Sequence, residues 1–177
     1  MYKAKKFISY MALCVLIFSL CACGEKGSEN AAIYGETVGG LEDNELFAII
    51  DTNSSLPVLL VTSQVYNDGL GNQAALNCDV YYLIDKEVKN IGTIESMGTA
   101  YPIAYDETGI YAASGHDMQR FEIEESGALK LAEGIFEQFD DSGNATYTMD
   151  KGDETKVITE EEYYAVFEKY NDATIVS

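Results

Sequence analysis

Tryptophan is absent from the 177-residue sequence, and histidine occurs once, as His116. The phosphate-binding loops of nucleotide-binding proteins are also missing, because Gly69-Leu70-Gly71 has no third glycine and no Gly-Lys-Ser/Thr occurs. No Gly-x-Ser-x-Gly elbow, the nucleophile motif of α/β-hydrolases, is found. The chain therefore carries none of the compact motifs of nucleotide-dependent or serine-hydrolase chemistry, and we expect no cofactor.

Basic residues are scarce. Eleven lysines and arginines stand against 30 acidic residues, which gives a formal net charge of −19. Such a surface repels nucleic acid and anionic lipid headgroups and attracts cations and basic partners. A simpler interpretation is that the charge keeps the protein soluble in crowded surroundings. We expect no nucleic acid among its partners.

The N-terminus has the layout of a signal peptide. Lys3, Lys5 and Lys6 precede an apolar run over residues 7–22. This run is shorter than the ~20 residues that a helix needs to cross a bilayer, which favours a cleaved leader over a transmembrane anchor. We therefore assign residues 1–22 to a signal peptide.

Leu20-Cys21-Ala22-Cys23 closes that run and resembles the lipobox of bacterial lipoproteins. The resemblance implies transfer of a diacylglyceryl group to the Cys23 sulfur, cleavage after Ala22, and a mature protein that begins with lipidated Cys23. Two acyl chains hold a protein stably on a membrane, whereas one chain binds only reversibly. Cys23 is thus the predicted lipidation site, and the predicted location is the extracytoplasmic face of a bacterial cell membrane.

Cleavage also changes the inventory of cysteines. Cys14 and Cys21 leave with the leader and Cys23 becomes a thioether, so that Cys78 is the one remaining thiol. No intramolecular disulfide and no cysteine-based zinc site is then expected. Three lysines also leave, so that 8 basic and 30 acidic residues remain, a net charge of −22.

The segment from residue 23 to 45 is predicted to be a flexible tether, because glycine and glutamate dominate it. Docking of Ile33, Tyr34 and Val38 as a short strand is the alternative. Residues 46–50 and 58–61 are apolar on both faces, which is typical of buried strands. Cys78 lies in an alternating apolar series and is predicted to be a buried strand thiol.

From about residue 74 to 158, short apolar stretches alternate with turns rich in glycine, asparagine and aspartate. This spacing predicts antiparallel strands joined by hairpins. The predicted fold is therefore mainly β, a β-rich α+β domain over residues 46–177 built as a meander, a sandwich or an open barrel. A fragment of a propeller is a further alternative.

One helix is predicted at about residues 160–170. Thr159 and Glu162 form a capping box, which marks the start of a helix. An apolar stripe at helical spacing follows, and it predicts packing on the sheet. The stripe consists of Tyr163, Val166, Phe167 and Tyr170.

Residues 140–170 combine a hairpin, a Gly-Asp turn and the Thr-x-x-Glu-Tyr-Tyr start of that helix. This combination resembles C-terminal modules of uncharacterised surface lipoproteins from anaerobic Gram-positive bacteria. The resemblance covers a small part of the chain and implies no activity.

His116 lies in Ser114-Gly115-His116-Asp117, so the three residue types of a catalytic triad fall within four positions. Triads are assembled from separate parts of a fold, because neighbours in one turn seldom align their side chains for the required hydrogen bonds. We therefore expect a solvent-exposed turn histidine and assign no catalytic residue. An extracellular hydrolase with a site near His116 is the alternative.

Acidic side chains cluster in two turns. An EF-hand loop that starts at Asp140 fails, since Ala145 stands in place of the glycine and Lys151 in place of the bidentate glutamate. Solvated hairpin tips are the simpler interpretation, and no metal site is assigned. The candidates for a weak, irregular calcium site are Asp140, Asp141, Asp150 and Asp153.

Several tyrosines fall on neighbouring predicted strands, namely Tyr81, Tyr101, Tyr105 and Tyr111. They would form a surface for a glycan or peptide, or else pack in core and edge positions, where tyrosine is common. The sequence thus predicts a lipid-anchored surface protein of unknown biochemical activity that binds a protein, peptide or glycan through a sheet edge or a tyrosine face. A hydrolase near His116 and a weak calcium-binding module are the alternatives.

Overall fold

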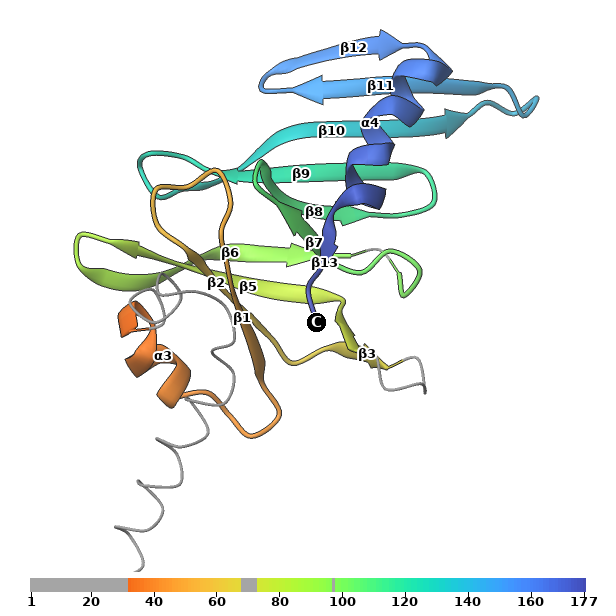
Figure 1. Ribbon diagram of the computed structural model, residues 1–177. Coiled ribbons are helices and arrows are strands. Elements are labelled where there is room, and N and C mark those ends of the chain that lie inside the picture. Colours follow the sequence, from red (N-terminus) through yellow and green to blue (C-terminus); the bar gives the residue numbers. More distant parts are fainter. Residues whose placement is uncertain (1–31, 68–72, 97) are drawn as a thin grey trace, which may run out of the picture.

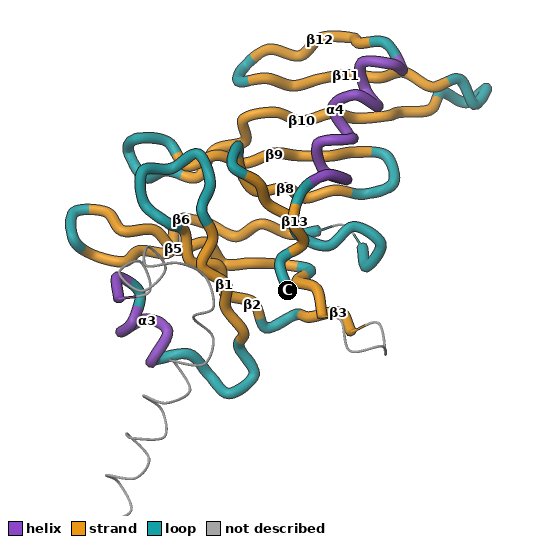
Figure 2. The backbone as a smooth tube through the Cα atoms, in the orientation of Figure 1, coloured by secondary structure: helices purple, strands orange, loops and turns teal. Residues whose placement is uncertain are grey.

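The computed structural model describes residues 32–67, 73–96 and 98–177, so that the predicted leader and Cys23 lie outside the described residues. Two large antiparallel sheets pack on each other (Figures 1 and 2). The segment containing helix α3 (Gly35–Gly39) covers the outer face of one sheet, and helix α4 (Glu160–Asp172) covers the other. The predicted β-rich fold class is confirmed, and both large sheets formed by the described residues are open.

The four-stranded sheet has the order β1 (Leu46–Ile50), β2 (Val58–Thr62), β5 (Asn77–Ile84) and β6 (Glu87–Glu95). β2 is buried along its whole length because both faces of the sheet are covered there. β5 alternates as predicted, and Cys78 is a free and fully buried thiol. Strands β3 (Val65–Asn67) and β4 (Gln73–Ala75) form a separate small ribbon.

The larger sheet contains a meander of six strands that are consecutive in sequence. After α4, the chain returns as β13, which pairs with β7 at the edge farthest from β12. α4 therefore crosses one face of the sheet from edge to edge (Figure 1). The order is β12 (Glu154–Ile158), β11 (Ala145–Lys151), β10 (Leu129–Phe139), β9 (Asp117–Ile123), β8 (Gly109–Ala113), β7 (Ala104–Asp106) and β13 (Thr174–Ile175).

Strand β10 contributes to two different cores. A β-bulge lies between Leu131 and Glu133, and such a bulge reverses the faces that the following side chains take. Leu129 accordingly packs between the two sheets, whereas Ile135 packs beneath α4. The bulge also turns Glu133 towards the helix, where it contacts Lys169.

Helix α4 begins and ends close to the predicted limits. Thr159 Oγ1 accepts a hydrogen bond from the backbone N–H of Glu162, and the Glu162 carboxylate accepts one from the N–H of Thr159, so the predicted capping box is confirmed. The predicted apolar stripe of the helix packs on the sheet, with Tyr163 and Tyr170 buried.

Part of the predicted tether is folded onto the four-stranded sheet. Tyr34 is fully buried, and its hydroxyl donates a hydrogen bond to the carbonyl of Pro57 at 2.6 Å. Ile33, Val38 and Leu41 pack on the same cluster, and the segment forms the short helix α3 instead of a strand. The globular unit thus begins before residue 46, because the outer face of β2 is apolar and is covered by this segment.

Candidate functional site

His116 lies in the turn between β8 and β9, where Ser114 Oγ accepts hydrogen bonds from the N–H groups of His116 and Asp117. Its side chain is 64% exposed, so the predicted exposed turn histidine is confirmed. Its side-chain partner is distant in sequence: Nδ1 lies 2.7 Å from Oε2 of Glu137 on β10, 21 residues away. The N–H of Glu137 also donates to the carbonyl of His116, which fixes the turn on β10.

Aromatic side chains surround the pair of His116 and Glu137. Phe139 meets the imidazole edge-on, with ring centroids 5.6 Å apart. Tyr147 on β11 lies opposite Glu137 and contacts Tyr163 of α4, with centroids 5.0 Å apart. We call this surface the His116 patch. It consists of His116, Glu137, Phe139, Tyr147, Tyr163 and Tyr164.

Glu137 is the charged centre of the His116 patch. Its side chain is only 12% exposed, its Oε2 lies 2.7 Å from His116 Nδ1, and it faces Tyr147 across the β10–β11 pair. Burial and, next, the interaction with the Glu137 carboxylate raise the pKa of Tyr147 to about 12. When His116 Nδ1 donates to Glu137, Nε2 carries the lone pair of the neutral ring and can accept a hydrogen bond.

Tyr163 carries a buried hydroxyl that has no hydrogen-bond partner among the described residues. Burial raises the pKa of this hydroxyl, and the charges of Glu137 and Asp117 raise it further. The group is therefore protonated across the physiological range and is a donor without an acceptor. Such groups are rare in native proteins, and each requires an explanation in structure or function.

The arrangement offers two of the three parts of a Ser-His-Asp type site, a carboxylate that orients an imidazole and the imidazole itself. A nucleophile is not in place, since no hydroxyl or thiol of the described residues is hydrogen-bonded to the His116 ring. Aromatic rings next to a carboxylate are, in contrast, a common environment for an ammonium or guanidinium group. The geometry is therefore better suited to binding a cation than to nucleophilic catalysis.

The four calcium candidates do not converge. Asp140 and Asp141 lie in the turn before β11, and Asp150 and Asp153 lie at its other end. A seven-residue strand separates these ends by about 20 Å. Asp140 is occupied by its own turn, where it accepts hydrogen bonds from the N–H groups of Ser142 and Asn144. Within the described ranges, no group of three histidine, cysteine, aspartate or glutamate side chains is placed to hold a metal ion.

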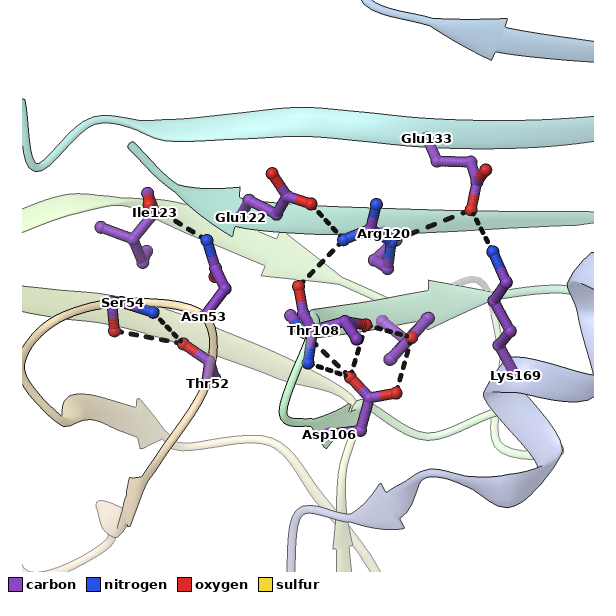
Figure 3. Close-up of polar contacts among 12 residues, drawn as sticks. Thr52, Asn53, Ser54, Asp106, Thr108, Arg120, Glu122, Ile123, Glu133 and Lys169 are labelled. Carbon is purple, nitrogen blue, oxygen red and sulfur yellow. Dashed lines mark hydrogen bonds and ion pairs between the residues drawn. The ribbon is translucent and has the colours of Figure 1, made fainter. Parts of the chain in front are cut away.

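A buried charge cluster holds α4 on the sheet (Figure 3). Glu133 is 4% exposed, and its carboxylate lies 2.8 Å from Lys169 Nζ of α4 and 3.8 Å from Arg120 Nε of β9. Arg120 also donates to the carbonyl of Thr108 and pairs with Glu122. A buried carboxylate is strongly destabilising without such partners. The cluster thus fixes the position of α4 and, with it, the tyrosines of the His116 patch.

The four tyrosines considered as a platform do not share a face. Tyr81 packs with the α3 segment and Tyr105 packs between the sheets, whereas Tyr101 and Tyr111 pack beneath α4. The most exposed aromatic side chains of the described residues are instead Phe139 and Tyr164, which are 55% and 51% exposed. Sequence reasoning places Tyr164 only in the Thr-x-x-Glu-Tyr-Tyr start of the helix and assigns no role to it, to Phe139 or to Glu137.

The predicted lipidation site, Cys23, is not among the described residues. Neither described helix combines the length and the apolar character needed to span a bilayer. Comparison of the chain with protein-family models, curated proteins and solved structures found no match.

Proposed function

We propose that the protein is a binding module of the bacterial cell surface, anchored through lipidated Cys23, that recognises a basic protein or peptide through the His116 patch. The observation that carries this proposal is a chain of aromatic contacts next to the Glu137 carboxylate. Exposed Phe139 contacts His116, the partner of Glu137, and exposed Tyr164 contacts the Tyr163 ring that packs on Tyr147, opposite Glu137. Aromatic faces attract ammonium and guanidinium groups by about 0.5–1 kcal/mol at exposed sites. The nearby carboxylate adds direct attraction for the same groups.

Long-range charge favours the same class of partner. The chain has a formal net charge of −19, and α4 starts with Glu160, Glu161 and Glu162 immediately before the patch tyrosines. A negative field of this kind raises the rate at which cations reach the surface. The interaction is expected to weaken with added salt, because the Debye length falls to about 8 Å at physiological ionic strength.

Binding is tested with the protein in its lipidated, membrane-anchored form and immobilised peptides rich in lysine and arginine. We expect the wild type to retain these peptides and the affinity to fall about fivefold in Phe139→Ala and in Tyr164→Ala, as loss of ~1 kcal/mol implies. Val157→Ala is the matched control. Val157 is an apolar residue that is 75% exposed, and it lies on the sheet face opposite α4 because its neighbour Ile158 packs beneath that helix.

Undiminished binding by both patch variants would refute the proposed site. Retention of neutral glycans but not of basic peptides would keep the patch as a binding site and change the class of ligand. The anchor is tested separately, since Cys23→Ser is expected to abolish incorporation of labelled palmitate and to release the protein from membranes.

An extracellular hydrolase is the second candidate, and the 2.7 Å contact between His116 and Glu137 is the observation that favours it. In this case the imidazole would act as a base oriented by the carboxylate. Hydrolysis of model esters or peptides that is lost in both His116→Ala and Glu137→Gln would support it. Equal rates in the variants and the wild type would remove it.

A further inference from the structure

The outer edge of β1 is an unpaired sheet edge within the described part of the chain. β1 lies at one end of the four-stranded sheet and pairs with β2 alone. In an edge strand, alternate backbone N–H and C=O groups point away from the sheet and can pair with an added strand. Leu46 and Phe47 on β1 are 45% and 46% exposed. The side chains at the start of this edge are therefore accessible, whereas Ile50 at its end is buried.

The other edges carry features that discourage pairing. β6 contains Glu87, Lys89 and Glu95, and its pairing register shifts partway along the strand. β12 contains Glu154 and Lys156, and β13 has only two residues. β1 has the sequence Leu-Phe-Ala-Ile-Ile, without charge, proline or glycine. It is thus the least protected of these four sheet edges.

We propose that β1 accepts an extended segment of a partner protein as an added antiparallel strand, and that this segment is apolar with basic residues at both ends. The proposal is independent of the His116 patch, whose residues belong to the seven-stranded sheet, its β8–β9 turn and α4. Recognition by strand addition takes its affinity from backbone hydrogen bonds and its specificity from side-chain pockets.

A small apolar cavity lies next to this edge. A small, partly open cavity of about 20 Å³ is lined by Leu46 and Ala48 of β1 and by Leu60, Cys78 and Val176 behind them, among others. Directly opposite residues in paired strands have Cβ atoms about 4.5–5.5 Å apart. An apolar side chain placed opposite Leu46 or Ala48 would therefore cover this cavity and extend the core between the sheets.

Charge distinguishes a basic partner from a second copy of the chain. Glu45 precedes β1 and Asp51 follows it. Antiparallel pairing of two β1 strands about Ala48 would place Glu45 of each copy opposite Asp51 of the other, and directly opposed like charges destabilise a sheet. Each chain also has a net charge of −19, so two copies repel each other. Lysine or arginine at the ends of the added strand would meet these acids favourably.

The test uses the full-length protein and a synthetic peptide with five valine and isoleucine residues between pairs of lysines. A matched peptide carries glutamates in place of the lysines. We expect the lysine peptide to bind the wild type and to slow hydrogen exchange of the amides in residues 46–50. The same peptide should bind Phe47→Lys about tenfold more weakly, a loss of ~1.4 kcal/mol. Val157→Lys is the control, because it places a lysine on another edge strand, β12, at a position that is 75% exposed, and is expected to change nothing.

Absence of slowed exchange in residues 46–50 would overturn the site, and equal binding of both peptides would overturn the assignment of basic ends. A dimer in sedimentation experiments that dissociates in Phe47→Lys would replace the partner by a second copy. If Phe47→Lys lowers the melting temperature, Leu46→Lys provides the same test at the neighbouring exposed position.

Discussion

Replacement of Tyr163 by phenylalanine is expected to stabilise the protein. The Tyr163 side chain is 2% exposed, and its hydroxyl has no hydrogen-bond partner among the described residues. An unsatisfied buried polar group costs about 1–3 kcal/mol, and removal of the oxygen leaves the ring and its packing unchanged. We therefore expect the free energy of unfolding to rise by about 1–3 kcal/mol. For a protein of this size, the melting temperature should rise by roughly 2–4 °C per kcal/mol.

Tyr170→Phe is the matched control, because Tyr170 lies two helical turns further along α4 and is also buried. Its hydroxyl donates to the carbonyl of Pro102 at 2.7 Å, so its removal should lower stability by about 0.5–1.5 kcal/mol. Urea denaturation followed by circular dichroism measures both changes. A loss of stability in Tyr163→Phe would refute the reasoning, since it would mean that the Tyr163 hydroxyl is hydrogen-bonded, for example to a buried water.

Two further perturbations test the contacts of α4 and of Asp106. Phe167→Asp should lower the free energy of unfolding by about 3 kcal/mol or more, because a charge would replace a ring in the aromatic cluster between α4 and the sheet. An unchanged melting temperature would show that the apolar stripe of α4 is not part of the core. For Asp106, burial opposes ionisation, but hydrogen bonds from Thr108, Tyr111 and Gly109 outweigh it and lower the pKa (Figure 3). The stabilisation is therefore present above the unfolded-state pKa and is lost as the pH falls through the folded-state pKa. Asp106→Asn should be less stable than the wild type at pH 7 and should differ less from it at pH 2. An equal difference in stability at both pH values, measured by urea denaturation, would contradict this.

The strands and the helix α4 follow from local patterns in the sequence. Alternation around Cys78 is sufficient to predict a strand with one buried face, because the side chains of a strand point to opposite faces with period 2. The Thr159 and Glu162 capping box is sufficient to place the start of α4, because it satisfies backbone groups that every helix leaves free at that end. Both signals depend only on residues that are close in sequence.

Docking of Tyr34 is only an alternative at the level of the sequence, because local patterns do not decide between it and a flexible tether. Tyr34 stands in a segment rich in glycine and glutamate, and its burial depends on the apolar outer face of β2 and on the distant acceptor at Pro57. The same limit applies to the His116 patch. Glu137 reaches His116 only because β9 and β10 pair in one particular register, with Asp117 opposite Phe136. Sequence reasoning identified His116 as an exposed turn residue but had no means of finding its partner.

The buried position of Tyr34 also changes how far the domain can stand from a membrane. If the boundary lay at residue 46, about 23 residues would separate it from lipidated Cys23, and an extended chain would span about 80 Å. Because Tyr34 is hydrogen-bonded to Pro57, only about 11 residues connect lipidated Cys23 to the folded domain, and an extended chain of that length spans about 40 Å. Under the proposed anchoring, a partner that binds β1 or the His116 patch must therefore approach close to the bilayer. The segments that the acidic ends of β1 and the carboxylate of Glu137 would attract at this short distance are basic ones.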